Sequence, residues 1–332
     1  MTTPPLPDHP AVPAVPAAPV AELAEVVRSG FTEGRHRGSL VVLAADGSVE
    51  FSLGSPGEPV FPRSSNKPMQ AAAILRTGLE LDGELLAVAA ASHSAETFHL
   101  DAVRKILAGA GLGVGALRTP ASWPLDEVEK DAWIRSGGQP EPILMDCSGK
   151  HAAMLAACVA RGWDTASYLD LAHPIQQQAL ETIQRLSGET VTAIGTDGCG
   201  APLMAVSLTG LARAFRAVLL ADPGSPERRV ADAMRAHPEY VAGTRRIDTW
   251  LMRGVPGALS KMGAEAVQAV ALPDGRALAF KIEDGGYRAV GPVLAAALRR
   301  MGVTGAGDTL SRIASAPLYG GGQPVGEVRA TF

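Results

Sequence analysis

The spacing of apolar residues gives the chain strand character at both ends and helical character in between. Near the N-terminus, apolar runs at 23–27 and 39–45 predict strands, and Asp46-Gly47 predicts a hairpin turn into a strand at 48–53. From residue 68 the period becomes helical, which predicts helices at 83–92, 97–111, 149–162, 173–187, 208–221 and 225–236. After these helices the pattern predicts strands at 264–272 and 276–282, a helix at 287–302 and a strand at 326–331.

This order of elements favours an α+β fold with two lobes. The economical arrangement is one antiparallel sheet built from both chain ends, with a helical lobe inserted between them. We expect a single catalytic domain over residues 21–332, with a sheet lobe at 21–62 and 259–332 and a helical lobe at 63–258. Residues 1–20 hold seven prolines among alanine and valine, which predicts a disordered tail. A cleft is expected where the lobes meet.

Composition excludes several classes of protein. With 46% hydrophobic and 19% charged residues, the 332-residue chain has the composition of a globular protein. A net charge of −4 without any basic run argues against nucleic acid as a partner. No apolar stretch has the length of a membrane span, and no secretory signal precedes the first strand. Three cysteines do not form a disulfide framework. We therefore expect a cytoplasmic protein that binds neither nucleic acid nor membrane.

The segment Arg63-Ser64-Ser65-Asn66-Lys67-Pro68 carries the first candidate chemistry. Ser64 and Lys67 are three residues apart at the start of a helix, so the hydroxyl and the amine share one face. A neutral amine could take the hydroxyl proton and create a nucleophile. We expect burial and neighbouring cations to lower the Lys67 pKa from about 10.4 to about 7. The chain uses only six lysines among 30 basic residues, so each lysine in a motif is notable.

Two further short motifs follow in order. Ser92-His93-Ser94 closes an apolar stretch, and Lys261-Met262-Gly263 precedes a predicted strand. Taken alone, the first motif is typical of the solvated end of a helix, and the second motif is typical of an ordinary lysine beside a strand. The glycine would let the backbone pass close to a ligand. The three motifs, S-x-x-K, S-x-S and K-x-G, occur in the same order as the S-x-x-K, S-x-N and K-T-G motifs of penicillin-recognising serine enzymes.

A second cluster combines thiols with other ligand types. Cys147, Lys150 and His151 lie at or beside a helix start, and Asp197 and Cys199 lie in a glycine-rich loop after a strand. Two thiolates are natural zinc ligands, but lysine is a rare one because it must first lose its proton. The residues alone leave two hypotheses open: a zinc site, or two cysteines that pack in the protein interior.

Five segments together resemble the rhizobial-type (class 3) L-asparaginases, which have a serine-β-lactamase-like fold. The segments are His36-Arg37-Gly38, Arg63 to Gln70, Ser92 to Glu96, Cys147 to His151 and Thr196 to Gly200. They occur in the family's order, and the likeness runs from about residue 22 to 332. The Cys-Ser-Gly-Lys-His segment is the most specific of the five, because ordinary serine lactamases lack it.

The resemblance implies a role for each matched residue. Ser64 and Lys67 would form one Ser-Lys pair, and Ser92 with Lys261 a second pair. A zinc ion would be held by Cys147, Lys150 and Cys199, with water as fourth ligand and Asp197 close to that water. Arg63 and His151 would line the substrate site. The family likeness also implies a homodimer.

We therefore expect hydrolysis of L-asparagine to L-aspartate and ammonia through an acyl-enzyme. Asp197 and Arg63 are the candidates for binding the substrate's ammonium and carboxylate. Glutamine stays possible as a substrate, because one methylene changes discrimination by only about 1–3 kcal/mol. Two alternatives stand beside this hypothesis: a β-lactamase-like hydrolase or esterase on the same scaffold, and a non-catalytic amino-acid-binding protein.

Overall fold

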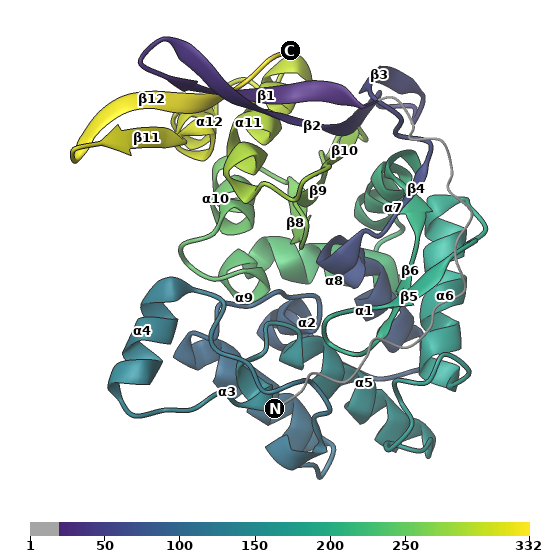
Figure 1. Ribbon diagram of the computed structural model, residues 1–332. Coiled ribbons are helices and arrows are strands. Elements are labelled where there is room, and N and C mark those ends of the chain that lie inside the picture. The colour runs from purple at the N-terminus through teal and green to yellow at the C-terminus, as the bar shows by residue number, and fades with distance from the viewer. Residues whose placement is uncertain (1–19) are drawn as a thin grey trace, which may run out of the picture.

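The computed structural model describes residues 20–332 and has two lobes (Figure 1). One lobe contains a large antiparallel sheet, and the other consists mainly of helices. The expected tail lies outside the described residues, apart from Val20. None of the helices in the described part of the chain combines the length and apolarity that a membrane crossing requires.

The sheet is built from both chain ends, which confirms the predicted α+β architecture. Its order is β11-β12-β1-β2-β10-β9-β8, with β3 also paired to β2, and every pairing is antiparallel. The strands of this sheet are β1 (Ala21–Arg28), β2 (Phe31–Leu43), β3 (Val49–Leu53), β8 (Leu259–Gly263), β9 (Val267–Ala271), β10 (Ala277–Ile282), β11 (Pro317–Gly320) and β12 (Gln323–Ala330).

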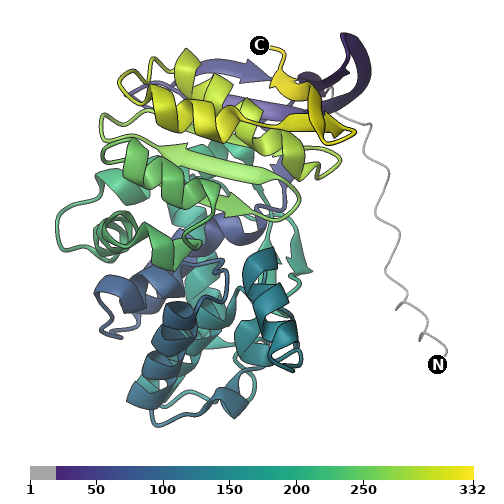
Figure 2. The ribbon, with the colours of Figure 1, turned by 90° about the vertical axis from the view of Figure 1, so that its left-hand side faces the viewer.

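The central strands are covered on both faces, which explains their nearly continuous apolar sequence. On one face, Val41 and Ala279 belong to the core shared with α7 (Leu208–Leu220). On the other face, Val42 and Phe280 belong to a second core with α11 (Val290–Arg300). Successive residues of a strand point to opposite faces, so one strand supplies both cores. Figure 2 shows α11 and α12 (Gly307–Ala314) together on the outer side of the sheet.

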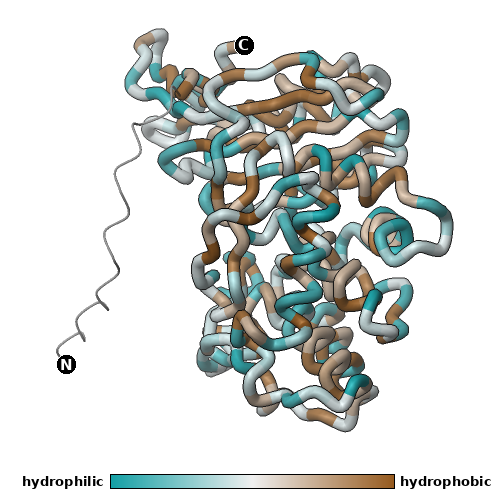
Figure 3. Tube along the Cα trace, turned by 90° about the vertical axis from the view of Figure 1, so that its right-hand side faces the viewer, coloured by the Kyte–Doolittle hydropathy of each residue, from teal (hydrophilic) through white to brown (hydrophobic). Residues whose placement is uncertain are grey.

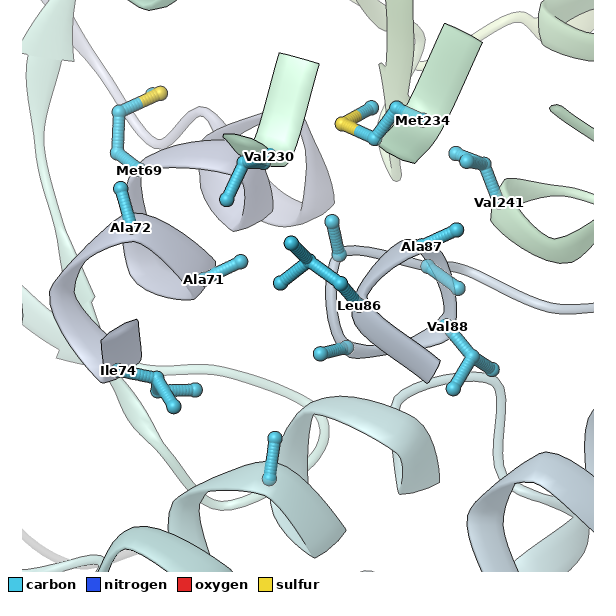
Figure 4. Packing of buried hydrophobic residues seen from close by; sticks show 14 of the residues in the cluster. Met69, Ala71, Ala72, Ile74, Leu86, Ala87, Val88, Val230, Met234 and Val241 are labelled. Carbon is cyan, nitrogen blue, oxygen red and sulfur yellow. The ribbon is translucent and has the colours of Figure 1, made fainter. Parts of the chain in front are cut away.

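The helical lobe packs around small and aliphatic side chains. Figure 4 shows Ala71 of α1 pointing toward Leu86 of α2, with Val230 and Met234 of α8 beside them, and Met69 of α1 belongs to the same core. The remaining helices extend this core. The helices of the lobe are α1 (Lys67–Arg76), α2 (Gly83–Ala89), α3 (Thr97–Gly109), α4 (Glu127–Arg135), α5 (Ser148–Arg161), α6 (Pro174–Ser187), α8 (Pro226–Ala236), α9 (Pro238–Val241) and α10 (Ile247–Gly254).

Short elements complete this part of the chain. The 3-10 turns are η1 (Arg63–Asn66), η2 (Val114–Ala116), η3 (Pro142–Leu144) and η4 (Tyr287–Ala289). Two small antiparallel pairs are β4 (Pro59–Val60) with β7 (Val206–Ser207), and β5 (Ile194–Thr196) with β6 (Pro202–Met204). The predicted loop after a strand at 197–200 is confirmed, because β5 ends at Thr196.

One predicted strand is wrong in its bounds. The pattern at 264–272 predicts a single strand, whereas the structure has a hairpin of β8 and β9 in this region. The connection uses Glu265 and Ala266, both with positive φ (60° and 54°). Tight hairpins usually mark such positions with Asn or Gly, so this turn carries no sequence signal.

The sequence pattern also missed α4, α10 and α12. Of these, α4 has no fully buried residue, so it lacks the apolar stripe that predicts a helix. It lies at one side of the helical lobe in Figure 1. Figure 3 shows hydrophobic colour along the sheet and hydrophilic colour on many outer loops.

Candidate active site

A cavity of about 610 Å³ contains both candidate serines. Its residues come from η1, the loop after α2, the start of α4, the segment before α5, the start of α10, the β8–β9 hairpin and η4. They are Ser64, Ser92, Leu125, Asp126, Glu127, Val128, Asp146, Arg246, Met262, Gly263, Ala264 and Tyr287. The sequence prediction of a site where the ends of the sheet meet the helices thus agrees with a cavity at this place.

Ser64 is presented by a tight turn that an edge strand supports. It is the second residue of η1, and the chain passes directly from η1 into α1. Strand β8 crosses this turn at Gly263, where a Cβ atom would lie 2.4 Å from Pro62 O and 3.3 Å from Ser64 N. Glycine is therefore required at 263 for contact with the turn that holds Ser64. Gly263 also lines the cavity, and the contact with a ligand that the sequence suggested stays a prediction.

The second serine lies between two buried lysines. Ser92 Oγ is 3.1 Å from Lys67 Nζ and 2.9 Å from Lys261 Nζ. We call these three residues the lysine–serine–lysine chain. Lys67 also donates to Ala91 O, and Lys261 donates to Met262 O. The expected Ser92–Lys261 contact is present.

The hydroxyl bonded to Lys67 is that of Ser92. Within residues 20–332, Ser64 Oγ forms no hydrogen bond, whereas Ser92 Oγ lies 3.1 Å from Lys67 Nζ. Ser64 and Lys67 still belong to the same first turn, and Ser64 lines the cavity. The structure therefore joins the two predicted Ser-Lys pairs into one site through Ser92.

The two lysines of this chain differ in pKa. Burial lowers the pKa of Lys261 to about 7, with repulsion from Lys67 acting in the same direction and attraction to Asp248 opposing it. Burial also disfavours charge on Lys67, but attraction to Cys147 and Asp146 outweighs it and raises the Lys67 pKa. The expectation of a lowered Lys67 pKa is therefore wrong, because the sequence did not reveal that the Asp146 carboxylate lies beside Lys67.

The loop that carries Ser92 is fixed by the segment before α10. Ser92 N donates to Val241 O at 2.9 Å, and Ser94 Oγ donates to Ala242 O at 2.7 Å. Glu96 accepts hydrogen bonds from the backbone and hydroxyl of Thr244 at 2.8 and 2.9 Å. Ser92 is thus held by the same segment that leads into Arg245 and Arg246.

The predicted metal ligands form a buried cluster next to this chain. The ligand atoms of Cys147, Asp197 and Cys199 all lie within 4.8 Å of one another, and Lys150 Nζ is 3.2 Å from Cys199 Sγ. We call these four residues the thiol cluster. Two sulfurs and a carboxylate oxygen are ligand types that zinc takes, and the Lys150 amine can join them once it has lost its proton. The donor set therefore fits the ion that the resemblance implies.

The two thiols differ in pKa because their surroundings differ. The hydrogen bond from Cys147 lowers the pKa of Cys199, while the same bond and burial raise the pKa of Cys147. Burial opposes a charge on Lys150, but the Cys199 thiolate overcomes this effect and raises the Lys150 pKa. His151 bonds Tyr168 OH through Nδ1 at 2.7 Å. Its Nε2 is buried, and the His151 ring is close enough to Cys199 to help lower the pKa of that thiol.

Arg63 and Asp197 are paired with each other. Arg63 Nε is 2.8 Å from Asp197 Oδ1, and Arg63 Nη1 is 3.9 Å from Glu265 Oε1. Arg63 holds a φ of +51°, a strained value for a non-glycine residue that typically occurs at functional sites. Neither Arg63 nor Asp197 is among the described residues that line the cavity.

Three residues of the site received no role from the sequence. Asp146 lies 3.5 Å from Lys67 Nζ, and its place beside Cys147 was the only signal available. Arg246 and Tyr287 line the same cavity, but they lie in segments without a recognisable motif. Only the folded chain brings them to the serines.

Comparison with known proteins places the chain among amide hydrolases. The model of the family described as L-asparaginase II matches residues 24–330. The chain belongs to the L-asparaginase II family. Its sheet from both chain ends and its inserted helical lobe agree with the serine-β-lactamase-like fold that the resemblance implied. None of the curated proteins compared with the chain matches it significantly.

Solved structures show only distant likeness. A β-lactamase from Mycobacterium bovis has 14% identity and a TM-score of 0.45, over 80% of this chain and 95% of its own. The native form of Mglu has 14% identity and a TM-score of 0.43, over 85% of this chain and 68% of its own. EstCE1, a hydrolase with promiscuous acyltransferase activity, has 12% identity and a TM-score of 0.40, over 83% of this chain and 93% of its own.

Proposed function

We propose that the chain hydrolyses L-asparagine to L-aspartate and ammonia through a serine acyl-enzyme. The observation that supports this proposal best is the lysine–serine–lysine chain beside a cavity that Ser64 lines. Covalent catalysis by serine needs a base within hydrogen-bond reach, and a lysine can serve only in its neutral form. Lys261, with a pKa of about 7, meets this second condition near neutral pH.

In this mechanism Ser64 is the nucleophile, as the sequence motif suggests. A proton passes from Lys67 through the Ser92 hydroxyl to neutral Lys261, so Lys67 becomes neutral. Lys67 then takes the Ser64 proton while Oγ attacks the side-chain amide carbon. The C–N bond breaks as the leaving nitrogen takes a proton from the lysine–serine–lysine chain, which gives ammonia and an ester on Ser64. A water molecule then attacks this ester and gives a proton to the lysine–serine–lysine chain. The bond between the acyl carbon and Ser64 Oγ breaks, Oγ takes a proton back from Lys67, and aspartate is released.

We further propose that Cys147, Lys150 and Cys199 hold a zinc ion, with Asp197 and His151 beside it. Zinc would supply positive charge to this wall of the site and bind a water or a substrate oxygen. The protein's own contribution is to keep two thiols and one amine buried at one place. The resemblance also implies a homodimer, and the sequence a cytoplasmic location; both stay predictions.

The test is ammonia release from a panel of amides by the purified protein. We expect L-asparagine to react far faster than its N-acetyl derivative or its α-amide, with L-glutamine measured alongside. Ser64→Ala should lose turnover, whereas Ser65→Ala should keep it. Ser65 is a useful control because its hydroxyl is buried and bonded to Pro62 O, and it does not line the cavity.

Two outcomes would replace this proposal. Rapid opening of the β-lactam nitrocefin without turnover of asparagine would support the lactamase alternative. Absence of any reaction, together with stabilisation of the fold by asparagine, would support an amino-acid-binding protein.

A further inference from the structure

The cavity beside the two serines contains one cation, and this cation is not the arginine that the sequence motifs single out. Among the described residues that line the cavity, Arg246 is the only one with a positive charge. Its side chain is half-buried at the start of α10, opposite Tyr287 of η4. Arg63, which the resemblance places in the substrate site, is already paired with Asp197.

Arg246 has no ion pair within residues 20–332. Its hydrogen-bond partners are both neutral: Met262 Sδ, in a weak contact of 3.6 Å, and the hydroxyl of Tyr287. The neighbouring Arg245 shows the contrast, because its guanidinium bonds both Asp126 and Glu129 at the start of α4. A partly buried guanidinium loses solvation, and neutral partners compensate for this loss less than an anion does. An anionic ligand would supply the negative charge that Arg246 lacks among its hydrogen-bond partners.

The position of Arg246 is fixed relative to the serines. The segment 241–244 bonds Ser92 and Glu96, as described above, and Arg246 follows it directly. On its other side, Arg246 leads into α10, whose Asp248 accepts hydrogen bonds from Met262 N and Ser260 Oγ of β8. The guanidinium therefore has a defined place between the serine loop and the strand that carries Lys261.

We propose that Arg246 binds the α-carboxylate of the amino-acid substrate, with Tyr287 forming the wall beside it. This inference rests on the proposed function and adds its specificity-determining residue. A guanidinium pairs with a carboxylate through two parallel hydrogen bonds, which fixes orientation as well as position. With the carboxylate at Arg246, the side-chain amide extends toward Ser64 and Ser92 across the same cavity.

The test compares ligands that differ only at the α-carboxylate. Loss of a charge-assisted hydrogen bond weakens binding by about 10- to 150-fold. In Arg246→Gln, we expect kcat/KM for L-asparagine to fall by this factor, while the value for L-asparaginamide changes by less than about threefold. Arg246→Lys should retain part of the preference for asparagine. Arg253→Gln, which alters an exposed arginine of the same helix, is the matched control.

Calorimetric binding provides a readout that does not need turnover. Wild-type protein should bind L-aspartate, and Arg246→Gln should weaken this binding by the same factor without weakening that of L-isoasparagine, which lacks the α-carboxylate. Equal affinity of both proteins for L-aspartate, or an equal loss for both ligands, would overturn the role of Arg246. Normal carboxylate dependence at Arg246 without asparagine turnover would instead overturn the proposed reaction and keep the carboxylate site.

Discussion

Two regions of this molecule bury lysine completely, yet they treat its charge in opposite ways. In the lysine–serine–lysine chain, Lys261 faces a hydroxyl and a carbonyl, and burial lowers its pKa to about 7. In the thiol cluster, Lys150 is equally buried, but the Cys199 thiolate 3.2 Å away raises its pKa. Burial disfavours the charged form in both places, so the neighbouring anion decides the outcome.

Lys67 lies between these two regions and shows the same rule. Its amine bonds Ser92 on one side and lies 3.5 Å from Asp146 on the other. Attraction to Cys147 and Asp146 keeps its pKa high despite burial. One fold can therefore keep a neutral amine and a charged amine on the same hydroxyl, as proton transfer through Ser92 requires.

Removing the neutral amine should have the largest effect. Lys261→Met keeps the volume of the side chain and deletes the base, so turnover should fall by about 100- to 10,000-fold. Lys105→Met, at an exposed position of α3, should leave turnover unchanged. Steady-state ammonia release measures both variants, and circular dichroism checks the fold. Turnover of Lys261→Met within threefold of wild type would remove Lys261 from the mechanism.

The second prediction concerns the thiol cluster. Cys199→Ala removes the thiolate, so zinc affinity should fall by more than the factor of about 10–100 that the loss of an outer-shell partner costs. Elemental analysis after mild purification should find one zinc per chain in the wild type and almost none in the variant. Cys158→Ala, which alters a buried cysteine outside the cluster, should retain zinc. Without zinc in the wild type, the buried-cysteine hypothesis would hold.

The third prediction concerns the pH dependence of turnover, which should follow the ionisation of Lys261. An amine with a pKa of about 7 is mostly charged at pH 6 and mostly neutral at pH 8. The limiting rate should therefore rise about tenfold over this range, since only the neutral form accepts a proton. A rate that is flat between pH 6 and 8 would contradict the base role.

The free energy of unfolding should also depend on the ionisation of Lys261. The folded pKa of Lys261 lies below the unfolded value, so unfolding takes up a proton between about pH 7 and pH 10.4. This group makes the free energy of unfolding rise with pH through that window. Lys261→Met should lack this contribution, which urea unfolding at pH 7 and pH 9 can measure.

The sequence predicted the parts of the site that motifs carry and missed those that only folding creates. Ser64, Lys67, Ser92 and Lys261 converge on one place, as expected from their order. The sheet from both chain ends also followed from periodicity, because its central strands are strongly apolar. The hairpin at Glu265 was not predictable, since its turn lacks the usual residues.

Charge states were the least predictable feature. The sequence placed Arg63 and Lys261 near Lys67 as cations that would lower its pKa. In the fold, Arg63 is paired with Asp197, and Asp146 lies beside Lys67 instead. Arg246 had no motif at all, because its importance comes from a cavity shared by segments far apart in the chain. Long-range neighbours decide such electrostatics, and a local pattern does not contain them.

The smallest expected effect lies at the rim of the cavity, where the ion pairs of Arg245 stay partly solvated. Arg245 bonds Asp126 and Glu129 of the α4 region, and its side chain is 40% exposed. Exposed ion pairs contribute about 0.2–1 kcal/mol, so Arg245→Gln should lower the free energy of unfolding by no more than about 1 kcal/mol. Because Asp126 and Val128 line the cavity, looser attachment of α4 should raise KM about two- to threefold and leave kcat unchanged. Urea unfolding and asparagine kinetics measure the two effects. A fall in kcat comparable to that of Lys261→Met would show that α4 acts on the chemistry itself, and the contrast between buried and solvated charges would no longer describe this site.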